Sequence, residues 1–256
     1  MIDLYYDLTP NGRKIHMALE ELELPYEVHW VAVKQGEQFS DEFTRINPNS
    51  KIPAIVDRDG PDGQAVRIFE SGAILHYLAE KTGRLMPKDV ALRWETTCWV
   101  FWQVANQGPA AGNAAHFTTY APDAGIDEPY ARERFQAETR RCCAVLDTRL
   151  AQSGTEFLVG DELTIADIAC FPWTRVLKAY GIDLAEYPAL QAWSTGISTR
   201  PSAKARVAEQ PEGSGMPTDL TSRQYEQLFG VALAERSRSS TALASWPAHR
   251  LRPPTH

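Results

Sequence analysis

The chain has 256 residues, of which 43% are hydrophobic and 23% are charged, and its formal net charge is −7. This acidic balance argues against a protein that binds the phosphate backbone of nucleic acids, because such proteins need a basic surface. No apolar run reaches the ~20 residues that a membrane span requires, and the N-terminus shows no secretory signal. We therefore expect a globular protein with no nucleic-acid partner and no membrane partner.

Cysteine usage agrees with this class of protein. None of the four cysteines forms a CxxC pair, and none precedes residue 98; they are Cys98, Cys142, Cys143 and Cys170. Free thiols in a reducing cytoplasm are the plain interpretation, and we expect no bound metal.

The first part of the chain alternates short apolar runs with helical patterns. Residues 1–7 predict a strand, 12–23 a helix, and 26–33 a second strand. Residues 52–71 read as a hairpin, and helical spacing returns over 72–81. The order β-α-β followed by β-β-α predicts a four-stranded mixed sheet flanked by helices, which is a thioredoxin-like α/β domain over residues 1–84.

The character of the chain changes after a linker at 83–89. Long amphipathic and aromatic-rich helical patterns predict an all-helical (all-α) domain over residues 90–207. Residues 208–256 form a C-terminal tail of loop composition, which we expect to be partly disordered or draped on the body, with a short helix over 222–236.

Three places in the first domain have residues suited to chemistry. In "NSKIPAIVD", Pro53 follows a polar loop and precedes an apolar strand. A trans edge-strand proline is one interpretation. The other is a cis Ile52–Pro53 bond, which costs only about 0.5–1 kcal/mol and would turn the Ile52 backbone toward an extended ligand.

The second place is "FESGAI", where a strand ends and a helix begins. Serine is a preferred N-cap, and the free amides of a helix start favour a bound carboxylate. Glu70 beside Ser71 is suited to an ammonium, so the pair fits the zwitterionic head of an α-amino acid. The simpler alternative is a capped helix with an exposed glutamate.

The third place is "TPNGRKIHMALEEL", which opens the first helix without a Cys, Ser or Tyr in its first turn. Thr9 and Asn11 are suited to a helix N-terminus, where an anion such as a thiolate would meet amides and the helix dipole. A plain capped helix is the alternative. Arg13 and Lys14 follow, either beside a bound anion or facing solvent. Gln38 lies in a later loop and is suited to a peptide-like ligand or to solvent.

These features, in this order, resemble the cytosolic glutathione S-transferases. "NPNSKIPAIVD" and "FESGAILHYLAE" look like the glutathione-site signatures of that family, and "LTIADIACFPW" looks like its helical capping motif. In that motif Thr164 caps, Asp167 completes the capping box, and Leu163 with Ile168 forms a hydrophobic staple. "TPNGRKI", "FWQVANQGP" and "PYARERFQAETRR" resemble the nu class, bacterial members with disulfide-bond oxidoreductase activity.

The resemblance implies a role for each of these positions. Asn11 and Thr9 would face the sulfur of glutathione, the cosubstrate. Gln38 and Lys51 would meet its glycine carboxylate, and the Ile52 backbone would pair with its cysteinyl unit, with Pro53 in cis. Glu70 would hold the γ-glutamyl ammonium and Ser71 the adjacent carboxylate. Arg134 matches a position associated with a second glutathione, although a lone helical arginine is also typical of a solvated or ion-paired surface.

The absence of a cysteine at the opening turn points to an activated glutathione thiolate that attacks disulfides, peroxides or electrophilic carbon. The alternatives are a β-etherase or detoxifying transferase acting on aromatic substrates, and a non-catalytic glutathione-binding relative. A homodimer is also implied. The aromatic residues expected to line an acceptor site between the domains are Trp99, Phe101, Trp102, His116, Phe117, Tyr120 and Trp173.

Overall fold

The computed structural model describes residues 1–207, 211, 214–215 and 221–229. Its sheet has the strand order β2-β1-β3-β4. The strands are β1 (Ile2–Tyr6), β2 (Tyr26–Trp30), β3 (Ala54–Asp57) and β4 (Val66–Phe69). β1 pairs in parallel with β2 and antiparallel with β3, and β3 pairs antiparallel with β4. The predicted four-stranded mixed sheet is therefore confirmed.

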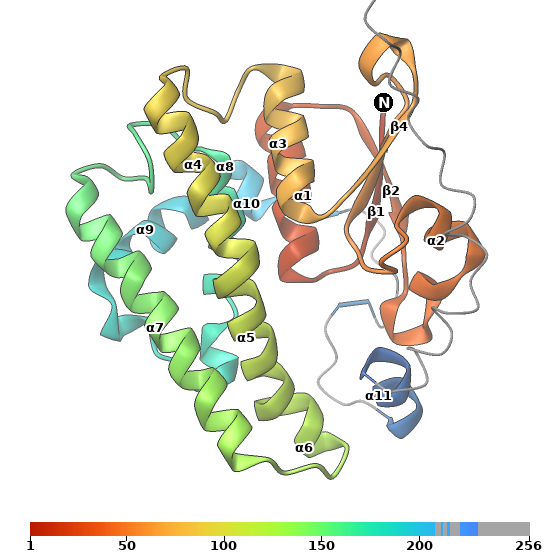
Figure 1. Cartoon of the computed structure of the whole chain (residues 1–256), viewed down its shortest axis with the longest axis vertical. Helices are drawn as coiled ribbons and strands as arrows, with labels where there is room; N and C mark the ends of the chain where they lie inside the picture. The colour runs from red at the N-terminus through yellow and green to blue at the C-terminus, as the bar shows by residue number, and fades with distance from the viewer. Residues whose placement is uncertain (208–210, 212–213, 216–220, 230–256) are drawn as a thin grey trace, which may run out of the picture.

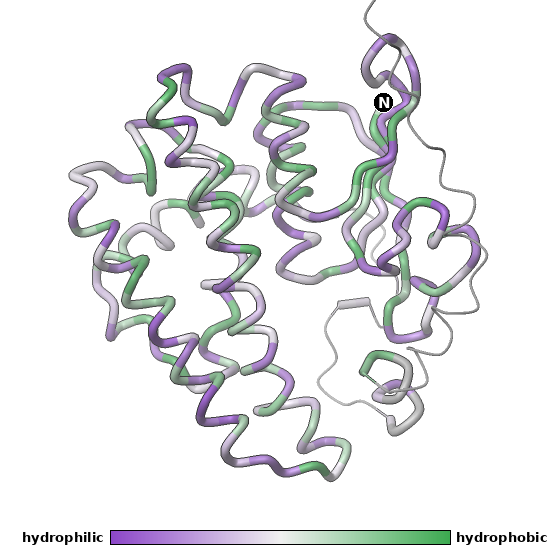
Figure 2. The backbone as a smooth tube through the Cα atoms, in the orientation of Figure 1, coloured by the Kyte–Doolittle hydropathy of each residue, from purple (hydrophilic) through white to green (hydrophobic). Residues whose placement is uncertain are grey.

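Helices cover both faces of this sheet. α1 (Pro10–Leu22) and α3 (Ser71–Thr82) lie on the face toward the helical part of the molecule, and α2 (Asp41–Ile46) lies on the other side (Figure 1). Leu4 and Ile55 from the strands pack in one core with Leu19 and Leu75 from the two helices, and all four are fully buried. In Figure 2 hydrophobic and hydrophilic residues are interspersed along the strands.

The helical part begins with one long, continuous helical run. α4 (Val90–Trp102) passes through a π-helical segment η4 (Gln103–Gln107) into α5 (Gly108–Ala115), and a second π-helical segment η5 (His116–Tyr120) leads into α6 (Ala121–Asp123). π-Helical segments inside α-helices are rare and frequently occur at functional sites, and the sequence pattern did not predict these two.

The remaining helices pack around this run. They are α7 (Pro129–Ser153), α8 (Ile165–Thr174), α9 (Pro188–Ser198) and α10 (Pro201–Lys204), with short 3₁₀ segments η1 (Val33–Gln35), η2 (Glu37–Phe39), η3 (Pro61–Gly63), η6 (Leu177–Tyr180) and η7 (Leu184–Glu186). α7 alternates polar and hydrophobic segments along its length in Figure 2, as expected of the predicted amphipathic helix.

α8 is buried along its whole length and packs against α1, which joins the two parts of the molecule. The predicted capping box is confirmed: Thr164 Oγ1 accepts a hydrogen bond from the Ala166 amide at 3.2 Å, and Asp167 Oδ2 accepts one from the Thr164 amide at 3.0 Å. Asp167 Oδ1 also accepts from Trp193 Nε1 at 3.0 Å, so the box anchors α9 as well.

A final helix, α11 (Ser222–Phe229), forms within the predicted 222–236 segment, whose remainder lies outside the described residues together with most of the tail. In Figure 1, α11 lies below the sheet on the side of α2. None of the helices in the described part of the chain combines the length and apolarity that a membrane crossing needs.

Candidate functional site

One edge of the sheet gathers most of the predicted site residues. Ala54 pairs with Tyr5 on one side and with Phe69 on the other. The end of β1, the start of β3 and the end of β4 therefore lie at the same edge. The register places three segments together there: the turn into α1, the Ile52–Pro53 loop and the turn into α3.

The start of α1 is a capped helix N-terminus. Thr9 is the N-cap residue, and its Oγ1 accepts a hydrogen bond from the Gly12 amide at 3.1 Å. Only glycine fits at position 12, because a Cβ there would lie 2.4 Å from the Asp7 carbonyl oxygen. Asn11 Oδ1 accepts a hydrogen bond from Trp173 Nε1 of α8 at 3.0 Å. The indole therefore fixes the Asn11 amide with its NH₂ group as the remaining, donating end.

The loop before β3 contains the cis Ile52–Pro53 bond. Of the two interpretations of Pro53, the cis peptide is confirmed. Asn47 holds this loop in shape: its Nδ2 donates to the Lys51 carbonyl at 2.6 Å, and its Oδ1 accepts from the Asn49 amide at 2.9 Å. Asn47 is 1% exposed, and the sequence patterns did not single it out.

The start of α3 differs from the prediction in one respect. Glu70, not Ser71, occupies the N-cap position, with a φ of 69° and no side-chain cap, and Ser71 is the first helical residue. The Ser71 hydroxyl is therefore not used as a cap. It accepts a hydrogen bond from Lys14 Nζ at 3.1 Å, while Glu70 is exposed at the rim.

Lys14 is a buried amine of α1 that contacts the start of α3. It is 1% exposed, so it faces neither solvent nor the outer surface. Its Nζ also donates to Gln103 Oε1 of η4 at 2.5 Å, which links α1, α3 and the helical part of the molecule. Burial lowers the pKa of Lys14 to about 7, against smaller opposing contributions from Cys170 and Glu70.

The sequence matches family models in both parts of the chain. The model of the glutathione S-transferase N-terminal domain matches residues 9–81, and that of the C-terminal domain matches residues 112–201. The disulfide-bond oxidoreductase YfcG of Escherichia coli is 49% identical over 220 residues, which cover 84% of this chain and 100% of that protein. The chain belongs to the glutathione S-transferase family.

Solved structures of other family members have the same architecture. A glutathione transferase from Burkholderia graminis, with two glutathione molecules bound per subunit, is 41% identical, with a TM-score of 0.74 over 78% of this chain and 85% of that one. A glutathione transferase from Pseudomonas putida, with one glutathione disulfide bound per subunit, is 38% identical, with a TM-score of 0.75 over 79% of this chain and 89% of that one.

The other predicted glutathione S-transferase site residues lie on three further segments. Gln38 follows β2 in η2, at the same end of the sheet, and is 5% exposed. Lys51 is exposed on the loop that carries the cis bond. Arg134 is exposed on α7, in the helical part of the molecule, where its charge acts on Glu138 one turn along the helix. Nothing in the described contacts joins Arg134 to the sheet edge.

Arg13 was expected to lie beside a bound anion or to face solvent, and in the structure it is half-buried and contacts backbone carbonyls. Its guanidinium donates to the carbonyl oxygens of Ala203 and Ala205 at 2.9 and 3.0 Å. These hydrogen bonds therefore join α1 to the end of α10 and satisfy carbonyl oxygens that have no partner within that helix.

The aromatic residues predicted for an acceptor site divide into two groups. Trp173 and Tyr120 share one buried cluster, against which Tyr225 of α11 packs. His116 stacks edge-on against Phe117 and Phe229, and its Nε2 lies 3.2 Å from the Tyr225 hydroxyl. The C-terminal helix thus contributes to this aromatic group. In contrast, Trp99 and Trp102 pack on the main core, and Phe101 is 64% exposed and contacts His76.

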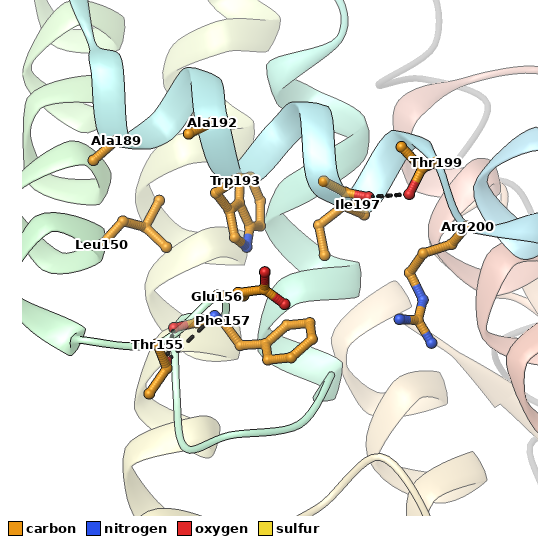
Figure 3. Close-up of a pocket in the computed structure, with 11 residues that line it drawn as sticks. Leu150, Thr155, Glu156, Phe157, Ala189, Ala192, Trp193, Ile197, Thr199 and Arg200 are labelled. Atoms are coloured by element: carbon orange, nitrogen blue, oxygen red, sulfur yellow. Dashed lines mark hydrogen bonds between the residues drawn. The ribbon is translucent and has the colours of Figure 1, made fainter.

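A pocket of about 440 Å³ lies between the start of α1, including Thr9, and α8. Another of about 490 Å³ lies between α7, the loop at 155–157 and α9, and contains none of the predicted site residues (Figure 3). Arg200 at its margin is already ion-paired with Glu21 at 2.6 Å. The charge of Arg200 is therefore already paired, and this second pocket is separate from the sheet edge.

The four cysteines are free and lie in the helical part of the molecule. Cys98 is exposed, whereas the other three are buried, and burial raises the pKa of Cys142 to about 11 and that of Cys143 to about 12. Buried thiols of this kind are poor nucleophiles.

Proposed function

We propose that this chain is a glutathione-dependent thiol–disulfide oxidoreductase that activates a bound glutathione thiol at the start of α1. The orientation of Asn11 is the observation that carries this proposal. Trp173 occupies its amide oxygen at 3.0 Å, which leaves the NH₂ group to donate to a sulfur at the N-terminus of a helix. A donor and the positive end of the helix dipole both favour a thiolate over a thiol.

The reaction needs no cysteine of the protein. The glutathione thiolate attacks one sulfur of a disulfide, a new S–S bond forms, and the other sulfur leaves as a thiolate that takes up a proton. A second glutathione then attacks the mixed disulfide and releases glutathione disulfide and the second thiol. Both electrons come from the two glutathione molecules.

The rest of glutathione would bind along the sheet edge. We assign the Ile52 backbone, presented by the cis bond at Pro53, to the cysteinyl unit. Glu70 and Ser71 are assigned to the γ-glutamyl head, and Gln38 and Lys51 to the glycine carboxylate. Solved structures of relatives hold two glutathione molecules or one glutathione disulfide per subunit, which supports a second glutathione position. We assign Arg134 to this second position.

The aromatic group formed by His116, Phe117, Tyr120, Tyr225 and Phe229 favours a second candidate activity. Aromatic rings stack on one another, so a site bordered by them suits an aromatic acceptor. A glutathione transferase or β-etherase acting on an aromatic electrophile is this candidate. Peroxides are a third acceptor class for the same thiolate.

We also propose a homodimer. Val90, Trp94 and Phe101 are all more than three-fifths exposed on α4, at 68%, 67% and 64%. Their spacing of four and seven residues puts them on one face of the helix. An exposed apolar stripe of this kind is typical of a protein–protein interface, and the free thiols fit our expectation of a cytoplasmic protein.

Turnover of three substrates by one enzyme preparation tests the proposal. With glutathione present, we expect hydroxyethyl disulfide to be reduced faster than cumene hydroperoxide or an aryl ether is consumed. Cys98→Ser should keep the disulfide activity, because Cys98 takes no part in the chemistry. Faster turnover of the aryl ether would favour the second candidate, and glutathione binding without turnover of any substrate would identify a binding protein.

A further inference from the structure

Lys14 is a buried amine that forms no ion pair with any carboxylate among the residues that the structure describes. Both of its hydrogen bonds in the described structure go to neutral groups, Ser71 Oγ at 3.1 Å and Gln103 Oε1 at 2.5 Å. An ammonium buried in this way is costly unless an anion lies close to it. Its position directly behind Ser71 suggests that the missing anion belongs to a ligand.

The charges around Lys14 support this view. The titratable groups that act on it are the Cys170 thiol of α8 and Glu70 at the start of α3, while η4 contributes only the neutral Gln103. Burial raises the pKa of Cys170, so that thiol stays uncharged at neutral pH. Glu70 is exposed and is assigned to the ligand ammonium. A ligand carboxylate beside the buried amine would therefore stabilise its charged form.

The hydrogen bond also fixes the direction of the Ser71 hydroxyl. While Lys14 is charged, its ammonium can only donate, so Ser71 Oγ then accepts from Lys14 and points its own proton elsewhere. Ser71 is the first residue of α3, where the backbone amides have no partner inside the helix. The hydroxyl proton and these amides are therefore available to one ligand carboxylate.

We propose that Lys14 is a positioning residue for the γ-glutamyl carboxylate of glutathione. Its ammonium holds the Ser71 hydroxyl as a donor to the carboxylate and supplies the buried counter-charge for it. This inference rests on the proposed function, because it takes glutathione as the ligand of this edge.

Ligand binding and protonation of Lys14 are then coupled. A carboxylate one serine hydroxyl away stabilises the charged amine and raises its pKa from about 7, so binding takes up a proton. For the same reason, the affinity for glutathione falls as the pH rises above neutrality, because Lys14 of the free protein loses the positive charge that attracts the carboxylate.

Titration calorimetry in buffers of different ionisation enthalpy tests this coupling. The ligands are S-methylglutathione, which has no titrating thiol, and its γ-aminobutyryl analogue, which keeps the amine but lacks the α-carboxylate. Near pH 7 we expect the wild type to take up ~0.4 proton per site when it binds S-methylglutathione and almost none when it binds the analogue. Equal uptake with both ligands would overturn the inference without any variant.

Two variants sharpen the test. Lys14→Met should reduce the preference for the carboxylate-bearing ligand by about tenfold or more and should abolish its proton uptake. Lys81→Met is the matched control, because Lys81 pairs with Asp57 at 2.8 Å near the far end of α3, and it should change neither quantity. Unchanged preference in Lys14→Met refutes the role of Lys14. Failure of the wild type to bind S-methylglutathione would instead refute the proposed function.

Discussion

The hydrogen bond between Trp173 and Asn11 leads to a quantitative prediction about the bound thiol. Asn11→Ala removes the amide that we assign to the sulfur, and Trp173→Phe removes only the indole N–H that orients this amide. Both variants should raise the pKa of the glutathione thiol in the complex, and Asn11→Ala should raise it more.

The expected magnitudes follow from the two hydrogen bonds. A hydrogen bond to a charged group contributes about 1.5–3 kcal/mol, and one pKa unit corresponds to about 1.4 kcal/mol, so Asn11→Ala should raise the thiol pKa by about one to two units. The indole bond is between neutral groups and contributes about 0.5–1.5 kcal/mol, which limits the effect of Trp173→Phe to about one unit.

The assay is a pH titration of the ultraviolet absorbance of the thiolate in the glutathione complex. Trp193→Phe is the matched control, because Trp193 Nε1 also donates at 3.0 Å, but to Asp167 in the helical core. This control should lower stability and leave the thiol pKa unchanged. If Asn11→Ala and Trp173→Phe both keep the wild-type thiol pKa while glutathione still binds, the assignment of Asn11 is wrong, and the backbone amides of α1 alone stabilise the thiolate.

Three further predictions concern stability and assembly. Native Lys14 loses its proton near pH 7 and unfolded Lys14 near pH 10.5, so the unfolded state holds more protons between these values. From about pH 7 to 9, the free energy of unfolding of the wild type should therefore rise by about 2–3 kcal/mol relative to that of Lys14→Met, as measured by urea titration. The same pH dependence in both proteins would contradict this prediction. Burial raises the pKa of Asp57, but hydrogen bonds from Lys81, Tyr77 and the backbone outweigh this and lower it overall. Asp57→Asn should lower the free energy of unfolding by about 2–4 kcal/mol at neutral pH. This difference from the wild type should shrink as the pH falls below about 4, where the wild-type carboxylate takes up its proton. A difference that stays constant with pH would refute the ion-pair explanation. Phe101→Glu should convert the proposed dimer to a monomer in light scattering, and an unchanged dimer mass would place the interface elsewhere.

Local sequence patterns predicted the parts of the site that depend on neighbouring residues. The cap at Thr9, the capping box at Thr164 and Asp167, and the turns at the sheet edge all join residues a few positions apart. Element ends shifted for local reasons too. The first helix begins at Pro10 and not at residue 12, because proline is favoured in the first turn and Thr9 caps it.

The parts that the sequence patterns missed depend on distant partners. Lys14 reaches Ser71 across 57 positions and Gln103 across 89, and Asn11 meets Trp173 across 162. Helical spacing shows which residues share a face, but it does not show which helix will cover that face. A lysine in the first turns of a helix therefore suggested solvent or an anion, and only the packing of η4 and α3 over α1 shows that its amine is enclosed.

The cysteine-free start of α1 also affects how the protein withstands oxidants. A cysteine with a lowered pKa in this position would be the first group attacked by peroxide, and oxidation beyond the sulfenic acid stage is essentially irreversible. In the proposed chemistry the vulnerable sulfur belongs to glutathione and leaves with each product. Over-oxidation then consumes a small molecule that the cell replaces, and the catalytic turn around Asn11 is intact for the next cycle.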